Sequence, residues 1–167
     1  MTQPSDPQVR QVVDRYRTCE FATLTKSGVP IAWPTASLYR DDGTFLITTS
    51  IALPQKAYNI RRDGRVSLLY SDPTGSGLVA PPAVLVQGDA TAPDEVVTWN
   101  DDLRDLWELL AVRQPASNAN SANPLSRWLM DWYYMRLLIP IVPRRIRWWP
   151  EGDFSRPVQE IEVRHVG

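Results

Sequence analysis

Hydrophobic side chains recur every three to four residues at the start of the chain, and this spacing predicts an N-terminal helix over residues 1–17. Ser5 with Gln8 three residues later is typical of a capping box, and Pro7 suits a first helical turn. The residues expected to face the core are Val9, Val12, Val13 and Tyr16. We therefore expect this helix to pack on the body of the protein.

From residue 18 to residue 92 the hydrophobic pattern approaches alternation, and short turn signals separate its segments. We predict strands at 21–25, 31–40, 44–50, 65–71 and 83–92. Pro30 and Pro34 have no backbone N–H to donate, so the second strand must lie at an edge or be bulged. A meander of this kind, interrupted by one helical segment, favours a small barrel over an open sheet.

Helical spacing returns after residue 92. We expect one helix to begin at Pro93 and Asp94 and a second over 124–138, after the polar stretch 114–123. Prolines then require an extended or turned chain, and a last barrel strand and a tail follow over 144–167. The prediction is a mainly β protein with flanking helices. Its barrel has six to seven strands, with an N-terminal helix and two helices between the fifth and last strands.

Composition limits the class of protein. The chain has 167 residues, of which 43% are hydrophobic and 22% charged, enough for a single domain over 1–167 with its own core. We divide this domain into a barrel core over 18–92 and a helical segment over 93–143, between the N-terminal helix and the last strand. The formal net charge is −1, so we expect no nucleic acid partner.

Cysteine and histidine occur once each, as Cys19 and His165, so one chain cannot assemble a disulfide framework or a Cys/His metal site. We assign neither residue a catalytic role. The N-terminus lacks the apolar run of a signal peptide, and no apolar span of about 20 residues occurs. We expect a cytoplasmic protein without a transmembrane segment. Peripheral membrane contact through the Trp-, Tyr- and Arg-rich stretch 127–149 is a minor alternative.

The segment 50–65 changes character abruptly after a β-branched strand. Pro54 stands where a helix would begin, and Lys56 lies in the first turn, beside the strand-end hydroxyls of Thr49 and Ser50. The free amides and the dipole of a helix N-terminus both favour an anion, and a lysine opposes that dipole unless an anion lies between them. The segment therefore predicts either a phosphate site or a solvated basic helix face.

Three segments, in their order and spacing, resemble the split-barrel flavin-binding proteins of the pyridoxamine 5'-phosphate oxidase-like superfamily. They are ATLTKSGVPIAWPTASLYRDDGTFLITTS, KAYNIRRDGRVSLLY and AVLVQGDATA. Within that superfamily the chain is most similar to the actinobacterial flavin/deazaflavin-dependent oxidoreductases. The resemblance covers about residues 18–92, and its most specific piece is a strand followed by K-x-x-N-[IL]-R-R-D. It implies an FMN-binding split barrel.

The resemblance also implies a cofactor site. Lys56 matches the lysine that binds the cofactor phosphate, with Thr49 and Ser50 as hydroxyl partners. Asn59 and Arg62 match supporting polar groups. The phosphate reading of segment 50–65 is the one that the resemblance favours.

Other positions match the parts of the family site that surround the flavin ring. These are Pro34, Thr35, Ala36 and Ser37 beside the ring and ribityl chain, and Gln87 and Gly88 on the fifth strand. The family forms its two sites at a homodimer interface, so Trp148 or Trp149 on the last strand is expected to reach the cofactor of the partner subunit.

The function implied is an FMN-dependent oxidoreductase that transfers hydride to or from a small molecule. Because the flavin carries the chemistry, no catalytic side chain is predicted. The ending QEIEVRHVG lacks the arginine-bearing signature of true pyridoxamine phosphate oxidases, so we do not expect vitamin B6 oxidation. The alternatives are an F420-dependent reductase that uses the same cradle, a non-catalytic flavin or haem carrier or sensor, and a barrel-shaped interaction protein.

Overall fold

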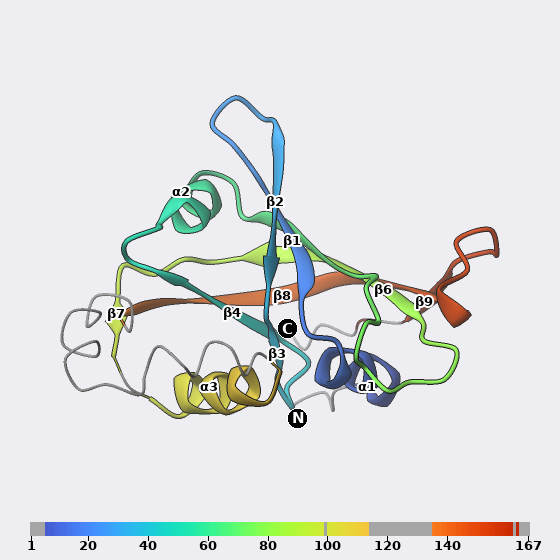
Figure 1. Cartoon of the computed structure of the whole chain (residues 1–167). Helices are drawn as coiled ribbons and strands as arrows, with labels where there is room; N and C mark the ends of the chain where they lie inside the picture. Colours follow the sequence, from blue (N-terminus) through green and yellow to red (C-terminus); the bar gives the residue numbers. More distant parts are fainter. Residues whose placement is uncertain (1–5, 99, 114–134, 162, 164–167) are drawn as a thin grey trace.

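The computed structural model describes residues 6–98, 100–113, 135–161 and 163. These residues form a curled, antiparallel nine-stranded sheet with helices packed on it (Figure 1). The strands are β1 (Cys19–Leu24), β2 (Pro30–Thr35), β3 (Leu38–Tyr39), β4 (Phe45–Ser50), β5 (Arg65–Tyr70), β6 (Ala83–Ala90), β7 (Val96–Val97), β8 (Arg136–Trp149) and β9 (Gln159–Ile161). The α-helices are α1 (Pro7–Arg15), α2 (Gln55–Arg62) and α3 (Asp101–Arg113), and a short 3-10 helix, η2, covers Pro150–Gly152.

Helix α1 forms as the apolar spacing predicts, and Val9, Val12 and Val13 on its inner face are fully buried. Its cap differs from the prediction. The carboxylate of Asp6 accepts hydrogen bonds from the backbone N–H of Gln8 (2.8 Å) and of Val9, so Asp6 satisfies the first free amides. Ser5, the predicted cap, lies outside the described residues.

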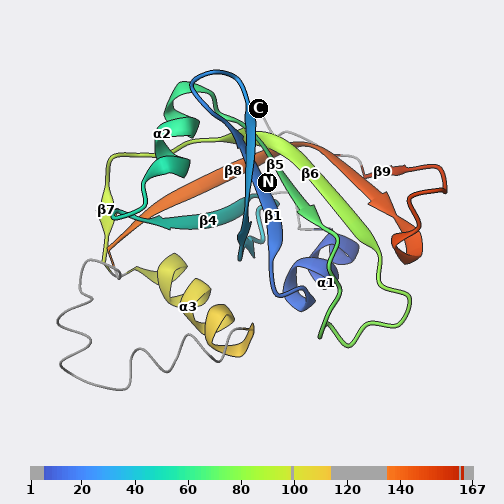
Figure 2. The same ribbon diagram turned by 45° about the horizontal axis from the view of Figure 1, so that its top comes forward.

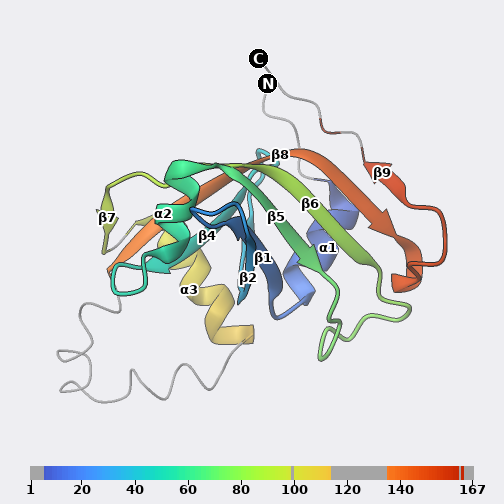
Figure 3. The ribbon, with the colours of Figure 1, turned by 90° about the horizontal axis from the view of Figure 1, so that it is seen from above.

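The sheet has the order β2-β1-β5-β6-β8-β4-β3, with β7 and β9 also paired to β8. Its two ends, β2 and β3, are halves of the single strand predicted over 31–40, and only Ala36 and Ser37 separate them. Three residue steps span at most about 11 Å, so the two edges of the sheet must approach each other. The sheet therefore curls into the predicted split barrel, and Figure 3 shows its curvature from above. Strand β2, with both prolines, is an edge strand as expected.

Strand β8 is the longest strand, with 14 residues, and it pairs with β4, β6, β7 and β9. The second helix predicted over 124–138 is wrong at its end, because residues 136–138 belong to this strand. The remainder of that predicted helix lies almost entirely outside the described residues. Pro140 and Pro143 are tolerated within β8, where Pro143 lies opposite a register shift in β6.

The first helix after the barrel core also starts later than predicted. Val96 and Val97 pair with β8 as strand β7, and α3 begins at Asp101. The side chain of Asn100 accepts a hydrogen bond from the N–H of Leu103 (2.8 Å), which makes Asn100 the cap. Among the described residues no helix is both long and apolar enough to cross a membrane.

Candidate functional site

Helix α2 presents Lys56 next to the end of β4, as the sequence predicts. The Lys56 ammonium is half-buried and lies 5.6 Å from the ring centroid of Trp33 on β2, a cation–π contact. Burial lowers the pKa of Lys56, and the positive charge of Arg136 lowers it further. No salt bridge joins Lys56 to a carboxylate within the part of the chain that the structure describes. Lys56 is thus a partly desolvated cation suited to an anionic ligand.

Arg136, the first residue of β8, is the second cation of this region. It lies opposite Ser50 of β4 in the register and is 9% exposed. Its guanidinium lies 5.0 Å from the ring centroid of Trp107 on α3. Helices α2 and α3 lie on opposite sides of β4 (Figures 1 and 2), and the contact with Trp107 links α3 to the start of β8.

The hydroxyls of Thr49 and Ser50 stabilise the turn that leads into α2. Thr49 Oγ1 donates to the carbonyl of Leu53 (2.9 Å), and Ser50 Oγ accepts from the N–H of Ala52 (3.3 Å). Both side chains are buried, with 3% and 5% exposed. Their observed contacts stabilise the turn that precedes Lys56 in the chain. Their contact with a phosphate stays a prediction.

Asn59 anchors α2 to the barrel. It is fully buried, its Nδ2 donates to Thr23 Oγ1 on β1 (2.9 Å), and its Oδ1 accepts from Gln55 and Arg62 (2.5 Å for Arg62). These partners within the protein occupy hydrogen-bonding capacity of the Asn59 amide that a ligand would otherwise use. Asn59 therefore positions α2 and Arg62. Both residues were predicted to be supporting polar groups of the cofactor site.

The other arginines of segment 50–65 are engaged with neighbouring groups. Arg61 forms a salt bridge with Asp94 (2.8 Å) and donates to two backbone carbonyls after β6. Arg65 pairs with Asp63 (2.6 Å), and this hydrogen bonding holds the pKa of Asp63 near 2. The segment is therefore not an open basic face, because two of its four basic side chains, Arg61 and Arg65, are paired with carboxylates.

The link between the two sheet edges, residues 34–37, contains a buried polar cluster. Ser37 and Tyr70 share a hydrogen bond of 2.5 Å between their hydroxyls, and the thiol of Cys19 donates to the carbonyl of Thr35 (3.3 Å). Burial raises the pKa of Cys19 to about 12, so this thiol stays protonated. Pro34 is exposed and Ala36 is half-buried. Pro34 and Ala36 are thus accessible to a ligand, whereas Thr35 and Ser37 are held by buried hydrogen bonds. The contact of residues 34–37 with a flavin ring stays a prediction.

Gln87 is exposed on β6, whereas Gly88 is buried against β8. A Cβ atom at Gly88 would lie 2.3 Å from the carbonyl oxygen of Val142. The neighbouring strand by itself therefore requires glycine here, at the register shift, whether or not a ring approaches it.

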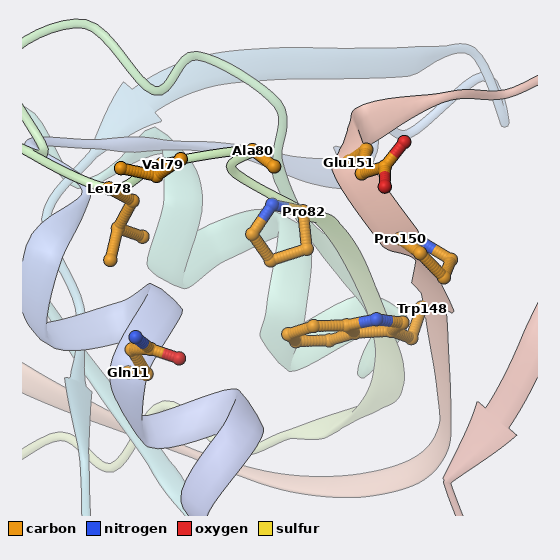
Figure 4. A pocket seen from close by; sticks show the side chains of 8 residues that line it. All are labelled: Gln11, Leu78, Val79, Ala80, Pro82, Trp148, Pro150 and Glu151. Atoms are coloured by element: carbon orange, nitrogen blue, oxygen red, sulfur yellow. The ribbon is translucent and has the colours of Figure 1, made fainter.

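Trp148 and Trp149 lie at the far end of β8. Trp148 forms one wall of a pocket of about 240 Å³ (Figure 4), which is lined by Gln11, Leu78, Val79, Ala80, Pro82, Trp148, Pro150 and Glu151. Trp149 packs on Phe154, with ring centroids 5.1 Å apart. Twelve residue steps, about 40 Å along the strand, lead from Arg136 to Trp148. Neither tryptophan joins Lys56 within one chain, so a shared site would need a second subunit.

Sequence reasoning missed three residues of this region. Trp33 contacts Lys56, Arg136 acts on Lys56 through its charge, and Trp107 contacts Arg136. Trp33 directly precedes the predicted ring-contacting Pro34, so its position on an edge strand was a usable signal. Trp107 lies in the helical segment 93–143, to which no site residue was assigned. Arg136 was placed in a helix, where nothing linked it to Lys56.

Comparison with known proteins supports the fold. The sequence matches no protein-family model and no curated protein. Among solved structures, a conserved hypothetical protein of Mycobacterium tuberculosis is 26% identical with a TM-score of 0.61, covering 95% of this chain and 92% of that one. An F420 reductase is 19% identical with a TM-score of 0.54, covering 82% and 94%. A Clostridium acetobutylicum protein of the pyridoxinephosphate oxidase family is 9% identical with a TM-score of 0.58, covering 93% and 92%.

A haem-binding protein of Mycobacterium smegmatis has the same fold, with 19% identity and a TM-score of 0.57 over 92% of this chain and 56% of that one. The chain therefore has the split-barrel fold of these proteins, as the resemblance in its sequence predicted.

Proposed function

We propose that the protein is a flavin-dependent oxidoreductase that binds FMN, with the cofactor phosphate at Lys56. The observation that carries the proposal is the half-buried Lys56 ammonium, whose pKa is lowered by burial and by Arg136 and which contacts Trp33. An anion beside this ammonium would stabilise its charged form, and FMN supplies that anion together with a planar ring.

In this proposal the protein binds, orients and shields the cofactor. Lys56 holds the phosphate, the turn fixed by Thr49 and Ser50 aims Lys56, and the exposed surface at Pro34 and Ala36 receives the ring. FMN, when bound, supplies the hydride chemistry, and the substrate is a small molecule that exchanges hydride with it. The two sites of a homodimer would each combine Lys56 of one subunit with Trp149 of the other.

A second candidate is an F420-dependent reductase, favoured by the structural likeness to an F420 reductase. F420 carries an acidic tail beyond its phosphate, and Arg61, Arg62 and Arg65 are the arginines of segment 50–65 that could bind it. Because Arg61 and Arg65 are already ion-paired with Asp94 and Asp63, only Arg62 lacks a carboxylate partner among these three described residues. This arrangement favours FMN as the cofactor. A haem carrier or sensor remains the non-catalytic alternative.

Titration with FMN and with F420 tests the proposal, using quenching of cofactor fluorescence. We expect FMN to bind more tightly than F420, and Lys56→Gln to weaken FMN binding about 10- to 100-fold, as expected for loss of a hydrogen bond to a charged group. Lys56→Arg keeps the charge and is the matched control. Equal FMN affinity in Lys56→Gln and the unmodified protein would refute the phosphate assignment, and tighter F420 binding would favour the second candidate.

A further inference from the structure

The pocket at the far end of β8 lies outside the Lys56 site. Its lining residues, named above, come from α1, from the loop that precedes β6, from the end of β8 and from η2. Successive side chains of a strand point to opposite faces, so Trp148, which lines the pocket, faces away from Trp149. Trp149 is the tryptophan assigned above to the cofactor site of the partner. The pocket is therefore a second candidate binding site, and it does not depend on the proposed function.

The walls of this pocket are held in place by the fold. The hydroxyl of Tyr16, at the end of α1, donates a hydrogen bond to the carbonyl of Pro82. Trp148 is paired opposite Val84 of β6 and is 9% exposed. A volume of about 240 Å³ is smaller than the range of about 300–1,000 Å³ that is typical for drug-sized ligands. The pocket therefore suits a small metabolite.

Two pocket residues have backbone conformations that side chains other than glycine rarely adopt. In the described part of the chain, the non-glycine residues with positive φ are Ala80 (51°) and Glu151 (58°), and both line this pocket. Such conformations cost free energy and occur preferentially at binding sites. At Glu151 the conformation also determines where a carboxylate lies.

The side chains around the pocket define the charge of a ligand. Figure 4 shows the indole of Trp148 almost edge-on, with Pro82 and Glu151 on one side of its plane and Gln11 beyond its edge. Among the eight residues that line the pocket, Glu151 is the only charged one. The face of an indole ring attracts a cation, and a carboxylate on the same side of the ring attracts it too. A cation over this face would gain both interactions.

Arg156 already interacts with the Glu151 carboxylate. Its guanidinium lies 3.2 Å from Glu151 and 3.1 Å from Asp153, so one cation is shared by two carboxylates and the group keeps one net negative charge. All three side chains are more than a third exposed. Ion pairs of this kind contribute little free energy, so a cationic ligand can compete for the Glu151 carboxylate.

We propose that this pocket binds a small organic cation, an alkylammonium or quaternary ammonium compound. The charged group lies over the indole face of Trp148 and is paired with Glu151. The apolar part of the ligand contacts Leu78, Val79 and Pro82, and the amide of Gln11 is available to a polar substituent.

The test uses choline and its neutral isostere, in which a tert-butyl group replaces the trimethylammonium group. The two compounds have nearly the same shape and differ in charge. NMR titration of the whole protein gives both dissociation constants. We expect choline to bind about tenfold more tightly than the isostere, because only choline gains the attraction of the ring and the carboxylate. Added sodium chloride should weaken the binding of choline and leave that of the isostere unchanged.

Two variants of opposite effect identify the residues. Glu151→Gln should remove most of the preference for choline, whereas Arg156→Gln should increase it, because the competing cation is lost. Glu160→Gln is the matched control for Glu151→Gln. Glu160 is 53% exposed and Glu151 is 54% exposed, both are paired with arginine, and Glu160 does not line the pocket. It should leave the preference unchanged.

The aromatic wall has its own variant. Trp148→Phe keeps a buried aromatic ring, and it should weaken choline several-fold while changing the isostere little, since phenylalanine attracts cations less than tryptophan. Circular dichroism and urea unfolding check the fold of each variant. Should Trp148→Phe not fold, the pair Glu151→Gln and Arg156→Gln decides.

Three results would overturn the inference. Equal affinity for choline and the isostere would show that the pocket has no preference for charge. Binding of choline that Glu151→Gln leaves unchanged would place the cation elsewhere. Absence of binding by both choline and n-butylammonium at millimolar concentration would show that the pocket takes no small organic cation.

Discussion

Lys56 combines a stability cost with the binding role proposed for it. Its pKa is lowered first by burial and second by Arg136, so the charged form is less favourable in the folded protein than in the unfolded chain. Between the lowered pKa and the ordinary value, the unfolded chain binds more protons, so stability rises with pH through that window. Below the window the full cost is present. A phosphate ligand would offset it.

The lowered pKa predicts an early loss of FMN affinity on the alkaline side. As pH rises, Lys56 should lose its proton, and with it the attraction for phosphate, before an ordinary lysine with a pKa near 10.5 would do so. Titrations with FMN from pH 7 to pH 10 measure the loss. Lys56→Arg should keep its affinity over the same range, since arginine stays protonated. Parallel curves for the two proteins would show that Lys56 does not contact the phosphate.

At the scale of elements, α2 is held in place by a polar contact with β1. Asn59 and Thr23 are both buried, with 0% and 2% exposed, and their side chains are hydrogen-bonded at 2.9 Å. Because the Lys56 ammonium is carried by this helix, the contact determines where the cation lies with respect to β4.

Asn59→Ala should lower the free energy of unfolding by about 2–3 kcal/mol, because it leaves Thr23 without its partner and opens a small cavity. Thr23→Val, which removes the same hydrogen bond from the other side, should have an effect of similar size. Urea unfolding measures both. If Asn59→Ala leaves stability unchanged and weakens only FMN binding, then Asn59 acts directly on the cofactor, as the sequence resemblance implied, and not as an anchor.

The sequence predicts the core strands and α2 well because their apolar spacing and turn residues are local signals. It does not reveal the break at Ala36 and Ser37, because the residues on either side of it read as one continuous strand. The break follows from closure of the sheet, which places the two halves at opposite edges. Closure is a property of the whole sheet, so the local sequence around Ala36 and Ser37 carries no signal for it.

The prediction fails most clearly where helix and strand patterns overlap. Leu137 and Leu138 fit the helical spacing of the preceding residues, yet they pair with Thr49 and Thr48 of β4. Tertiary pairing therefore outweighs local preference at the start of β8. The same error hid the position of Arg136 opposite Ser50 of β4.

For the whole molecule, the distance between Lys56 and Trp149 makes assembly testable. In a homodimer with shared sites, Lys56→Gln and Trp149→Ala would damage the same site from different subunits. Mixed dimers of the two variants should then contain one intact site each, so unfolding and refolding an equal mixture should restore FMN binding to about a quarter of all sites. Each variant alone is the control. No recovery in the mixture would show that each site forms within one chain.

Strand β8 also determines when the molecule can fold during synthesis. Strands β2, β1, β5 and β6 form one part of the sheet and β4 with β3 forms another, and in the strand order only β8 joins them. Since β8 follows all of these strands in the chain, a ribosome must have made about 149 residues before the two parts can be paired. Until then the edges of β6 and β4 are unprotected and can pair with other chains. We expect a nascent chain that ends before β8 to depend on chaperones, whereas one that includes β8 does not.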